Sequence, residues 1–391
     1  MSMELKLDSE IIYENKLDTI KFAKMLDDPS QCYKFYWLEA ILNLIRDNEV
    51  VSFDAIINEM ICGAWYTVTC FHLHLGPVIK NKTENFLEHA INTLAKNSDL
   101  SQDAEREDII AAIKLNEKEL RSDKTNLTNC VPYRLLSSFL DELGGGNKLW
   151  NQRGRLIEYI NRMNEKTSLL YTIIDGKGLQ KKIRINPHWR QLILDNYPVI
   201  YSWIQLKKIR FLQDRNPGVP GIIYKLEREN NKIRKLHHAR ELWKSAVEIG
   251  GSPIYDIYSG KELDLKSYDL DHFVPRSYIA NDELWNLTPM EKRLNSSKNN
   301  RLPEWDSYFP GLAGNQYYLY KIVFSNPGIR KKFENCRRDN LNAIWASETL
   351  FIEGNTEERF TNILEHNLKP LHESALLQGY GLWKCPADLI L

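Results

Sequence analysis

The spacing of apolar residues in the first third of the chain is the strongest constraint on its fold. Between residues 33 and 45, apolar side chains recur every three or four positions, at Phe35, Leu38, Ile41, Leu42 and Ile45. This period places them on one face of an α-helix, and so apolar a face has to be covered by other elements. The chain has 391 residues, enough for more than one packed domain. We therefore predict a mainly α multidomain protein.

Charge is distributed unevenly, although 52 basic and 52 acidic side chains cancel over the whole chain. Residues 1–120 hold 21 Asp and Glu against 12 Lys and Arg, whereas residues 177–244 hold 16 Lys and Arg against five acids. Three consecutive glycines at 144–146 do not fit a regular element and mark a boundary. We predict an acidic helical domain at 1–145, for regulation, oligomerisation or partner docking, and a basic, mostly helical region at 146–248.

Four cations near the end of the basic region follow a helical spacing. Lys225, Arg228, Lys232 and Lys235 stand three, four and three residues apart, so a helix would carry them on one side. Apolar residues occupy the adjoining sector, which would pack on the protein. The pattern predicts a nucleic-acid-binding stripe that faces a phosphate backbone. The alternative is a charged face that only contacts solvent.

The sequence favours neither a membrane protein nor a secreted one. Residues 61–79 contain no Lys, Arg, Asp or Glu and could span a bilayer by length, but they include two His, two Gly and a Pro and have few Leu and Ile. Six cysteines are scattered without a C-x-x-C pair, which argues against a zinc ribbon and a disulfide scaffold. We expect a cytoplasmic protein with no membrane partner.

Residues 268–303 combine the side chains that phosphodiester hydrolysis requires. Their sequence is YDLDHFVPRSYIANDELWNLTPMEKRLNSSKNNRLP. Alternation and aromatic content predict a strand over 268–274 and a second short strand over 284–287. Thr288, Pro289 and Glu291 have the spacing of a capping box, which predicts a helix that starts there and carries Asn295 and Lys298.

Hydrolysis of a phosphodiester needs a base, a cation and fixed geometry. His272 has the one type of side chain whose unperturbed pKa lies close to neutral, which suits a general base. Asp271 and Asn295 offer the hard oxygen ligands that Mg²⁺ prefers. Lys298 is predicted to hold the phosphate. Taken alone, an Asp-His pair in a strand is most often structural, and the full set of residues is what favours a catalytic site.

Asp-His-x-x-Pro, then Asn-Leu, then Asn-x-x-Lys on a helix resembles the HNH endonucleases, which have a ββα-metal fold. The residues YDLDHFVPRS and NSSKNNRLP are most similar to the HNH domains of RNA-guided CRISPR nucleases. The resemblance implies a small α+β nuclease domain at 249–310, followed by a helical extension at 311–391. It also implies that Asp271 and Asn295 bind a single metal ion and that His272 is the base. Asn286 would orient the active-site loop, and Asp269 matches a further acidic position near the metal.

The chain departs from many HNH proteins in having no paired cysteines beside the site. Tyr255, Tyr258 and Gly260 occupy the segment where a first pair would stand, so no structural zinc is expected. The resemblance implies Mg²⁺ as the catalytic ion, with Mn²⁺ as an alternative. An ideal strand sends Asp271 and His272 to opposite faces, so both can reach one phosphate only if the strand twists or ends there.

The resemblance implies an endonuclease with DNA as its substrate and bacterial anti-phage defence as its role. A homodimer and a regulatory or sensor protein are the protein partners that we expect. Two alternatives stay open. One is a nucleic-acid-binding or adaptor protein in which the HNH segment is only structural. The other is an HNH nuclease that restricts modified DNA.

Overall fold

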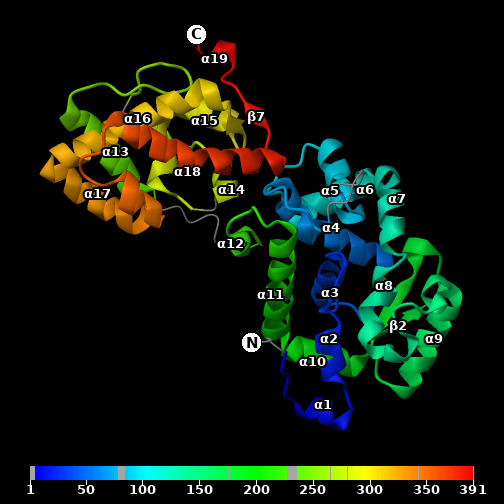
Figure 1. Cartoon of the computed structure of the whole chain (residues 1–391). Helices are drawn as coiled ribbons and strands as arrows, with labels where there is room; N and C mark the ends of the chain where they lie inside the picture. Colours follow the sequence, from blue (N-terminus) through cyan, green and yellow to red (C-terminus); the bar gives the residue numbers. More distant parts are fainter. Residues whose placement is uncertain are drawn as a thin grey trace. The chain divides into compact units, whose positions relative to one another are not determined.

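The structure is a computed structural model, and it describes residues 5–77, 84–174, 176–226, 236–264, 266–279, 281–341 and 343–390. The chain divides into two compact units, which we call unit 1 (up to Pro217) and unit 2 (from Gly218 onward). Most described residues are helical, as the sequence predicts, and the strands form small sheets (Figure 1).

Unit 1 is built from helices with one small sheet. Its α-helices are α1 (Glu10–Glu14), α2 (Thr19–Lys24), α3 (Tyr33–Leu44), α4 (Phe53–Thr69), α5 (Phe86–Lys96), α6 (Arg106–Leu115), α7 (Glu117–Leu127), α8 (Val131–Arg134), α9 (Arg153–Lys166), α10 (Pro187–Asp195) and α11 (Tyr197–Arg215). Short 3₁₀ turns are η1 (Leu135–Phe139), η2 (Asp141–Leu143), η3 (Lys148–Asn151) and η4 (Gly178–Gln180). The strands are β1 (Val50–Ser52), β2 (Tyr171–Ile174) and β3 (Lys182–Ile185).

Helix α3 forms the centre of unit 1 and confirms the helix predicted from apolar spacing. The predicted face is buried, but so is every residue from Phe35 to Leu42, because α4, α8 and α11 all pack around α3. Trp37 of α3 meets Phe53 of α4 edge to face, with ring centroids 5.5 Å apart. A period in the sequence shows one buried face, whereas only the packing shows how many neighbours a helix has.

The sheet of unit 1 joins segments that are far apart in the sequence. Strand β3 lies between β1 and β2 and pairs antiparallel with both, so that Val51 lies opposite Ile183. Phe22 near the N-terminus stacks on Trp189 at 5.0 Å. The glycines at 144–146 are an exposed turn, yet the elements on both sides of them share one core. The compact units therefore divide at Pro217 and not at the predicted boundary near 145.

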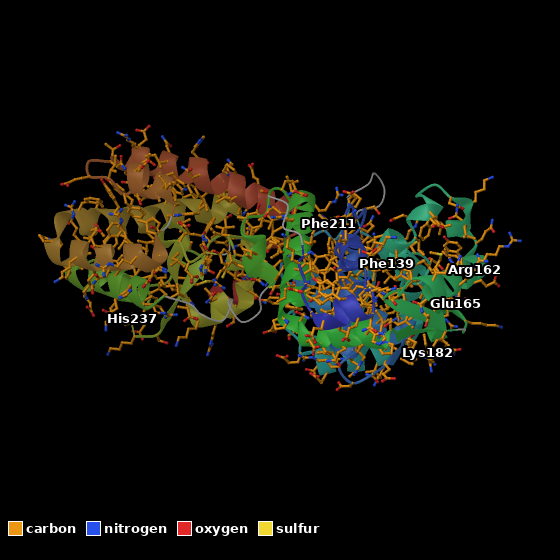
Figure 2. All side chains as sticks on the ribbon, turned by 90° about the horizontal axis from the view of Figure 1, so that it is seen from below. Phe139, Arg162, Glu165, Lys182, Phe211 and His237 are labelled. Atoms are coloured by element: carbon orange, nitrogen blue, oxygen red, sulfur yellow. The ribbon has the colours of Figure 1, made fainter. Side chains whose placement is uncertain are left out.

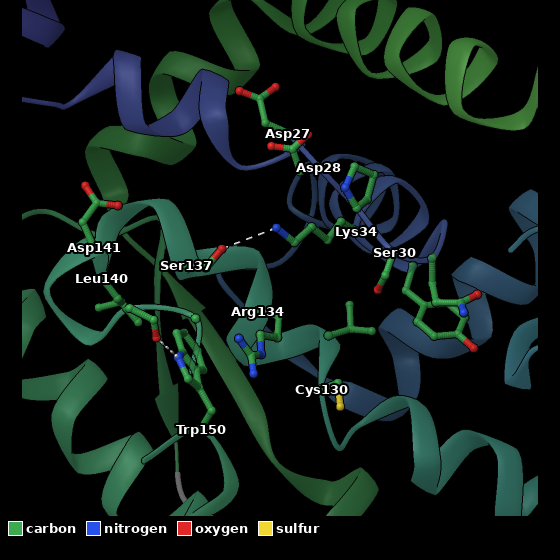
Figure 3. Close-up of a pocket in the computed structure, with 16 residues that line it drawn as sticks. Asp27, Asp28, Ser30, Lys34, Cys130, Arg134, Ser137, Leu140, Asp141 and Trp150 are labelled. Atoms are coloured by element: carbon green, nitrogen blue, oxygen red, sulfur yellow. Dashed lines mark hydrogen bonds between the residues drawn. The ribbon is translucent and has the colours of Figure 1, made fainter. Parts of the chain in front are cut away.

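A cavity of about 730 Å³ lies in unit 1 between the α2–α3 connection and the segment from α8 to η3 (Figure 3). Lys34 donates to the carbonyl of Met25 at 3.0 Å and to the Ser137 hydroxyl at 3.4 Å. The Arg134 guanidinium lies over the Trp150 ring at 4.2 Å. Asp27, Asp28 and Asp141 also line the cavity, so charges of both signs face it.

Unit 2 packs helices around two pairs of short strands. Its helices are α12 (Ile222–Leu226), α13 (His237–Gly250), α14 (Arg276–Ile279), α15 (Lys292–Lys298), α16 (Trp305–Ser325), α17 (Pro327–Asn340), α18 (Glu357–Leu377) and α19 (Ala387–Ile390), with a 3₁₀ turn η6 (Leu284–Asn286) and a π-helical turn η7 (Ala346–Leu350). The strands are β4 (Tyr268–His272), β5 (Leu287–Glu291), β6 (Leu302–Pro303) and β7 (Leu382–Trp383).

The order β4, β5, α15 is the ββα arrangement expected for residues 268–303, but the helix starts later than predicted. Thr288 to Glu291 do not open a helix; they belong to β5, which pairs antiparallel with β4 from Tyr268↔Glu291 to His272↔Leu287. The Glu291 amide donates to the Asp256 carboxylate at 2.7 Å and holds the end of β5 extended. Pro289 is tolerated because a two-stranded sheet has only edge strands.

The C-terminal helices and the ββα segment form one compact unit, which differs from the predicted division at 248 and 310. Strand β7 pairs in parallel with β6, directly after α15. Trp383 of β7 is buried against the rings of Tyr258 and Tyr308, with centroids 5.2 and 6.2 Å away. The small ββα segment buries too little apolar surface alone, and the C-terminal residues complete its core.

The described part of the chain contains no helix that is both long and apolar enough to cross a membrane. Most of the uncharged stretch at 61–79 lies in α4 and the turn that follows, and its last two residues are outside the described ranges. Large side chains of α4 such as Trp65 are buried in unit 1. Apolar and charged side chains of unit 1 differ in the same way elsewhere. In Figure 2, Phe139 lies inside the unit, whereas Arg162, Glu165 and Lys182 project outward.

The packing of β7 predicts that Trp383→Ala destabilises unit 2. Removal of a buried Trp side chain should lower the free energy of unfolding by about 3–5 kcal/mol. The neighbouring Leu382 is 56% exposed, so Leu382→Ala should change it by less than about 0.5 kcal/mol. Chemical denaturation of the full chain measures both values. Equal losses in the two variants would contradict this account of the core.

Candidate functional site

The candidate site lies where one face of β4 meets one face of α15. Asp269 and Asp271 are two residues apart on β4 and so point to the same side of the strand. Asn295 and Lys298 are three apart on α15 and share a helix face. The Asn295 amide donates to Asp269 Oδ2 at 3.4 Å, and Lys298 Nζ donates to Asp271 Oδ1 at 3.0 Å. The strand and the helix are thus joined by two polar contacts side by side.

Asp271 is deeply buried, and both of its carboxylate oxygens accept a hydrogen bond. Its side chain is 4% exposed, and Tyr258 donates its hydroxyl to Oδ2 at 2.6 Å. Burial raises the pKa of the Tyr258 hydroxyl, and the neighbouring Asp271 charge raises it further. Tyr258 therefore remains a neutral donor. The sequence predicted no role for Tyr258 beyond the absence of a cysteine in this segment.

Lys298 does not occupy the exposed, phosphate-facing position that the sequence predicted for it. Its side chain is 1% exposed, and Nζ also donates to the His272 carbonyl at 2.7 Å. Burial lowers the pKa of Lys298, while the Asp271 carboxylate acts in the opposite direction and favours the charged form. In this arrangement Lys298 neutralises Asp271 and fixes the end of β4, rather than presenting an ammonium group to solvent.

His272 closes β4 and has its own partners. Asp282 Oδ1 lies 2.8 Å from His272 Nε2 and 3.3 Å from Arg276 Nε. The imidazole thus has different partners from the Asp271 carboxylate, as strand alternation requires. Asp282 was not singled out from the sequence, although it stands only ten residues after His272. A carboxylate paired with an imidazole orients the ring and stabilises the imidazolium that forms when the ring accepts a proton.

Asn286 fixes the chain that follows His272. Its side chain is fully buried, accepts from the Val274 amide at 2.9 Å and donates to the Val274 carbonyl at 2.8 Å. The Phe273 amide also donates to the Asn286 carbonyl, at 2.9 Å. An amide that makes both bonds to one residue holds that backbone in a single conformation.

Side chains from the C-terminal helices hold the other side of the loop. Gln316 of α16 donates to the carbonyls of Leu284 and Leu287, at 2.9 and 2.7 Å. Asn340 of α17 donates to the Asp282 carbonyl at 3.1 Å. These contacts place Asp282 next to His272. No local sequence motif predicts them, because Gln316 and Asn340 lie outside the motif.

The oxygen donors at this face fit a hard divalent cation. Asp269, Asp271 and Asn295 supply carboxylate and amide oxygens, the ligand type of Mg²⁺. Asp269 is 27% exposed and Asn295 is partly exposed, which leaves them accessible to a hydrated ion. Each oxygen of Asp271 accepts a hydrogen bond through one lone pair and has a second lone pair. In the described part of the chain, no three His, Cys, Asp or Glu side chains cluster as a metal site.

The predicted basic stripe is only partly within the described residues. Arg228, Lys232 and Lys235 lie outside them. Lys225 belongs to α12 but is 1% exposed, so it does not line a phosphate-facing stripe. Its ammonium donates to the Ser277 carbonyl and to the Tyr278 carbonyl, the latter at 2.8 Å. Carbonyls in the last turn of a short helix such as α14 lack helical partners, which explains the inward position of Lys225.

Comparison with known proteins agrees with the ββα geometry. Residues 256–304 match the family model described as HNH endonuclease. The matched segment contains β4, β5 and α15, and it confirms the resemblance to HNH endonucleases. No curated protein and no solved structure matches the chain. The similarity to the domains of RNA-guided nucleases stays a prediction.

The buried pair between β4 and α15 predicts that Lys298→Met is strongly destabilising. It leaves the Asp271 carboxylate buried without its counterion, which should cost about 3–5 kcal/mol of unfolding free energy. Lys292 is exposed on the same helix, so Lys292→Met serves as the matched control and should be nearly neutral. Denaturant unfolding of the two full-length variants measures the difference. If Lys298→Met is as stable as its control, the pair does not hold α15 on β4.

Proposed function

We propose that this chain, whose residues 256–304 match the HNH endonuclease family, hydrolyses phosphodiester bonds of DNA with the help of a divalent metal ion. One observation carries the proposal. The ββα segment brings the His272 imidazole, the carboxylates of Asp269 and Asp271 and the Lys298 ammonium together around the end of β4, which supports the proposal. The family match suggests nuclease activity on a nucleic acid. We further propose that the substrate is DNA, that the ion is Mg²⁺ and that the protein acts in defence.

His272 is the proposed general base, which takes a proton from the attacking water. The Asp282 carboxylate at 2.8 Å would stabilise the imidazolium that forms, and Arg276 beside Asp282 balances the remaining charge. Asn286 acts as a positioning residue, because it fixes Val274 two residues after the base. The contacts of Asp282 and Asn286 support these proposed roles, because they hold the His272 imidazole in one orientation.

Asp271 and Asn295, with Asp269 beside them, are the proposed holders of the ion, Mg²⁺ or Mn²⁺. A bound divalent ion would neutralise the charge that develops on the phosphoryl and leaving oxygens. Lys298 serves this site indirectly, because its ammonium group donates to the Asp271 carboxylate and holds it in place. The alternative of an adaptor with a purely structural HNH segment is less favoured, since the acid, imidazole and amide are all present and held in place by hydrogen bonds.

The first test of this proposal is His272→Ala in a plasmid cleavage assay. Loss of a positioned base should slow cleavage by roughly a hundredfold to ten-thousandfold. Circular dichroism checks that the variant folds. EDTA should silence the wild-type protein, and added Mg²⁺ should restore it. Activity of His272→Ala equal to wild type would falsify the base assignment, and full activity in excess EDTA would exclude metal assistance.

A second prediction concerns the number of strands cut. The chain has one Asp-His set and one Asn-x-x-Lys set, and one metal site addresses one phosphate at a time. Each protomer should therefore nick, and a double-strand break would require two protomers related by a two-fold axis. Supercoiled plasmid should pass through an open-circular form, and linear product should rise steeply with protein concentration. Linear product formed by a monomer without a nicked intermediate would contradict the single-site reading.

A further inference from the structure

A wide groove in unit 1 lies between α7 and the segment from η4 to the start of β3. We infer that this groove, which we call the α7 groove, binds the phosphate backbone of duplex DNA. Its volume is about 1310 Å³. It is lined by Ser52, Asp54, Glu117, Lys118, Arg121, Thr125, Gly176, Lys177, Gly178, Leu179, Gln180 and Lys182. The inference goes beyond the proposed chemistry because it concerns unit 1 and needs no cleavage.

Four exposed cations face the α7 groove from different elements. Lys118 and Arg121 are three residues apart on α7, and Lys177 and Lys182 flank η4. Helix α7 contacts η4 directly, which brings the two pairs to one groove. Within the described ranges, none of the four cations forms an ion pair with an acidic side chain. Cations that the fold leaves without acidic partners are available to phosphate groups.

The acids of the α7 groove are already neutralised in part. The ammonium of Lys124, which is fully buried, lies 2.6 Å from Asp54 Oδ1 and 2.7 Å from Glu117 Oε2. One buried cation thus pairs with two acids that line the groove. Among the described residues that line the groove, the four exposed cations outweigh the single negative charge that remains, although residues 1–120 are acidic as a whole.

The lining chemistry favours a duplex backbone over other ligands. The α7 groove is larger than a typical small-molecule pocket of about 300–1,000 Å³. None of its described lining residues is aromatic, so it offers no platform on which the bases of a single strand could stack. Ser52, Thr125 and Gln180 add polar groups of the kind that bind phosphate and sugar. Gly178, at φ +53° with open space where a Cβ would stand, leaves the loop backbone accessible.

The experiment is a binding titration of the full-length protein in EDTA, where no cleavage is expected. The probe is a fluorescent 30-base-pair duplex, and anisotropy is recorded at several KCl concentrations. The groove variant combines Lys118→Gln, Arg121→Gln, Lys177→Gln and Lys182→Gln. The control combines Lys24→Gln, Lys148→Gln, Lys166→Gln and Arg210→Gln, which removes the same charge from exposed positions outside the groove. Thermal unfolding establishes that both variants are folded.

The groove variant should bind the duplex more weakly, and its salt dependence should flatten. Each lost contact should lower the log–log slope by about 0.9, so loss of all four lowers it by about 3.6. The slope of the control variant should differ from the wild-type slope by less than the change expected for one lost contact, about 0.9. Equal slopes for wild type and groove variant, or equal losses in both variants, would overturn the inference.

Two further measurements distinguish this inference from binding of a protein partner and from the proposed nuclease activity. An acidic peptide tested as a competitor should displace the duplex poorly; a peptide that binds wild type well and the groove variant weakly would overturn the inference in favour of a protein partner. Plasmid cleavage in Mg²⁺ is measured on the same preparations. If the wild-type protein does not cleave but its binding depends on the groove cations, the proposed nuclease activity is contradicted and the α7 groove inference stands. If cleavage is normal but binding does not depend on the groove cations, the α7 groove inference is contradicted and the proposed nuclease activity stands.

Discussion

The buried pair of Asp271 and Lys298 is the interaction on which the candidate site depends. A carboxylate that is 4% exposed is stable only if its charge is balanced and its oxygens are hydrogen-bonded, and Lys298 and Tyr258 do both. Because Lys298 lies on α15, the need to neutralise Asp271 also fixes this helix on β4. The residue three positions earlier, Asn295, then meets Asp269. The proposed metal-binding face is thus a consequence of how one buried charge is satisfied.

The His272 side of the candidate site depends on residues far along the chain. Asn286 fixes the backbone after His272, but Asp282 is held in turn by Asn340 of α17, and the turn before β5 is held by Gln316 of α16. Trp383 from β7 packs on Tyr258, the donor to Asp271. A ββα segment of this size has little core of its own, so helices outside the matched region supply the rigidity that a catalytic arrangement requires.

Charge in this protein acts through position rather than through totals. Residues 1–120 carry an excess of acid, yet Lys118 and Arg121 contribute to a groove in which the described cations outnumber the acids, and Lys124 neutralises those acids in part. Lys225 shows the reverse. It belongs to the most basic stretch of the chain, and its ammonium points inward to carbonyls of α14. Net charge describes a segment, whereas the ligand that a surface can bind depends on which charges remain exposed and unbalanced.

The sequence alone determined the mainly helical class, the central helix at 33–45 and the family of residues 256–304, because apolar period and motif spacing are local properties. Tertiary structure decided the rest. Residues 288–291 have a helix-start pattern but form β5, since pairing with β4 satisfies their backbone. The sequence also left Asp282, Tyr258 and the C-terminal helices out of the site and placed Lys298 and Lys225 at phosphate. Long-range packing determines which polar groups meet and which charges are buried, and no local pattern records it.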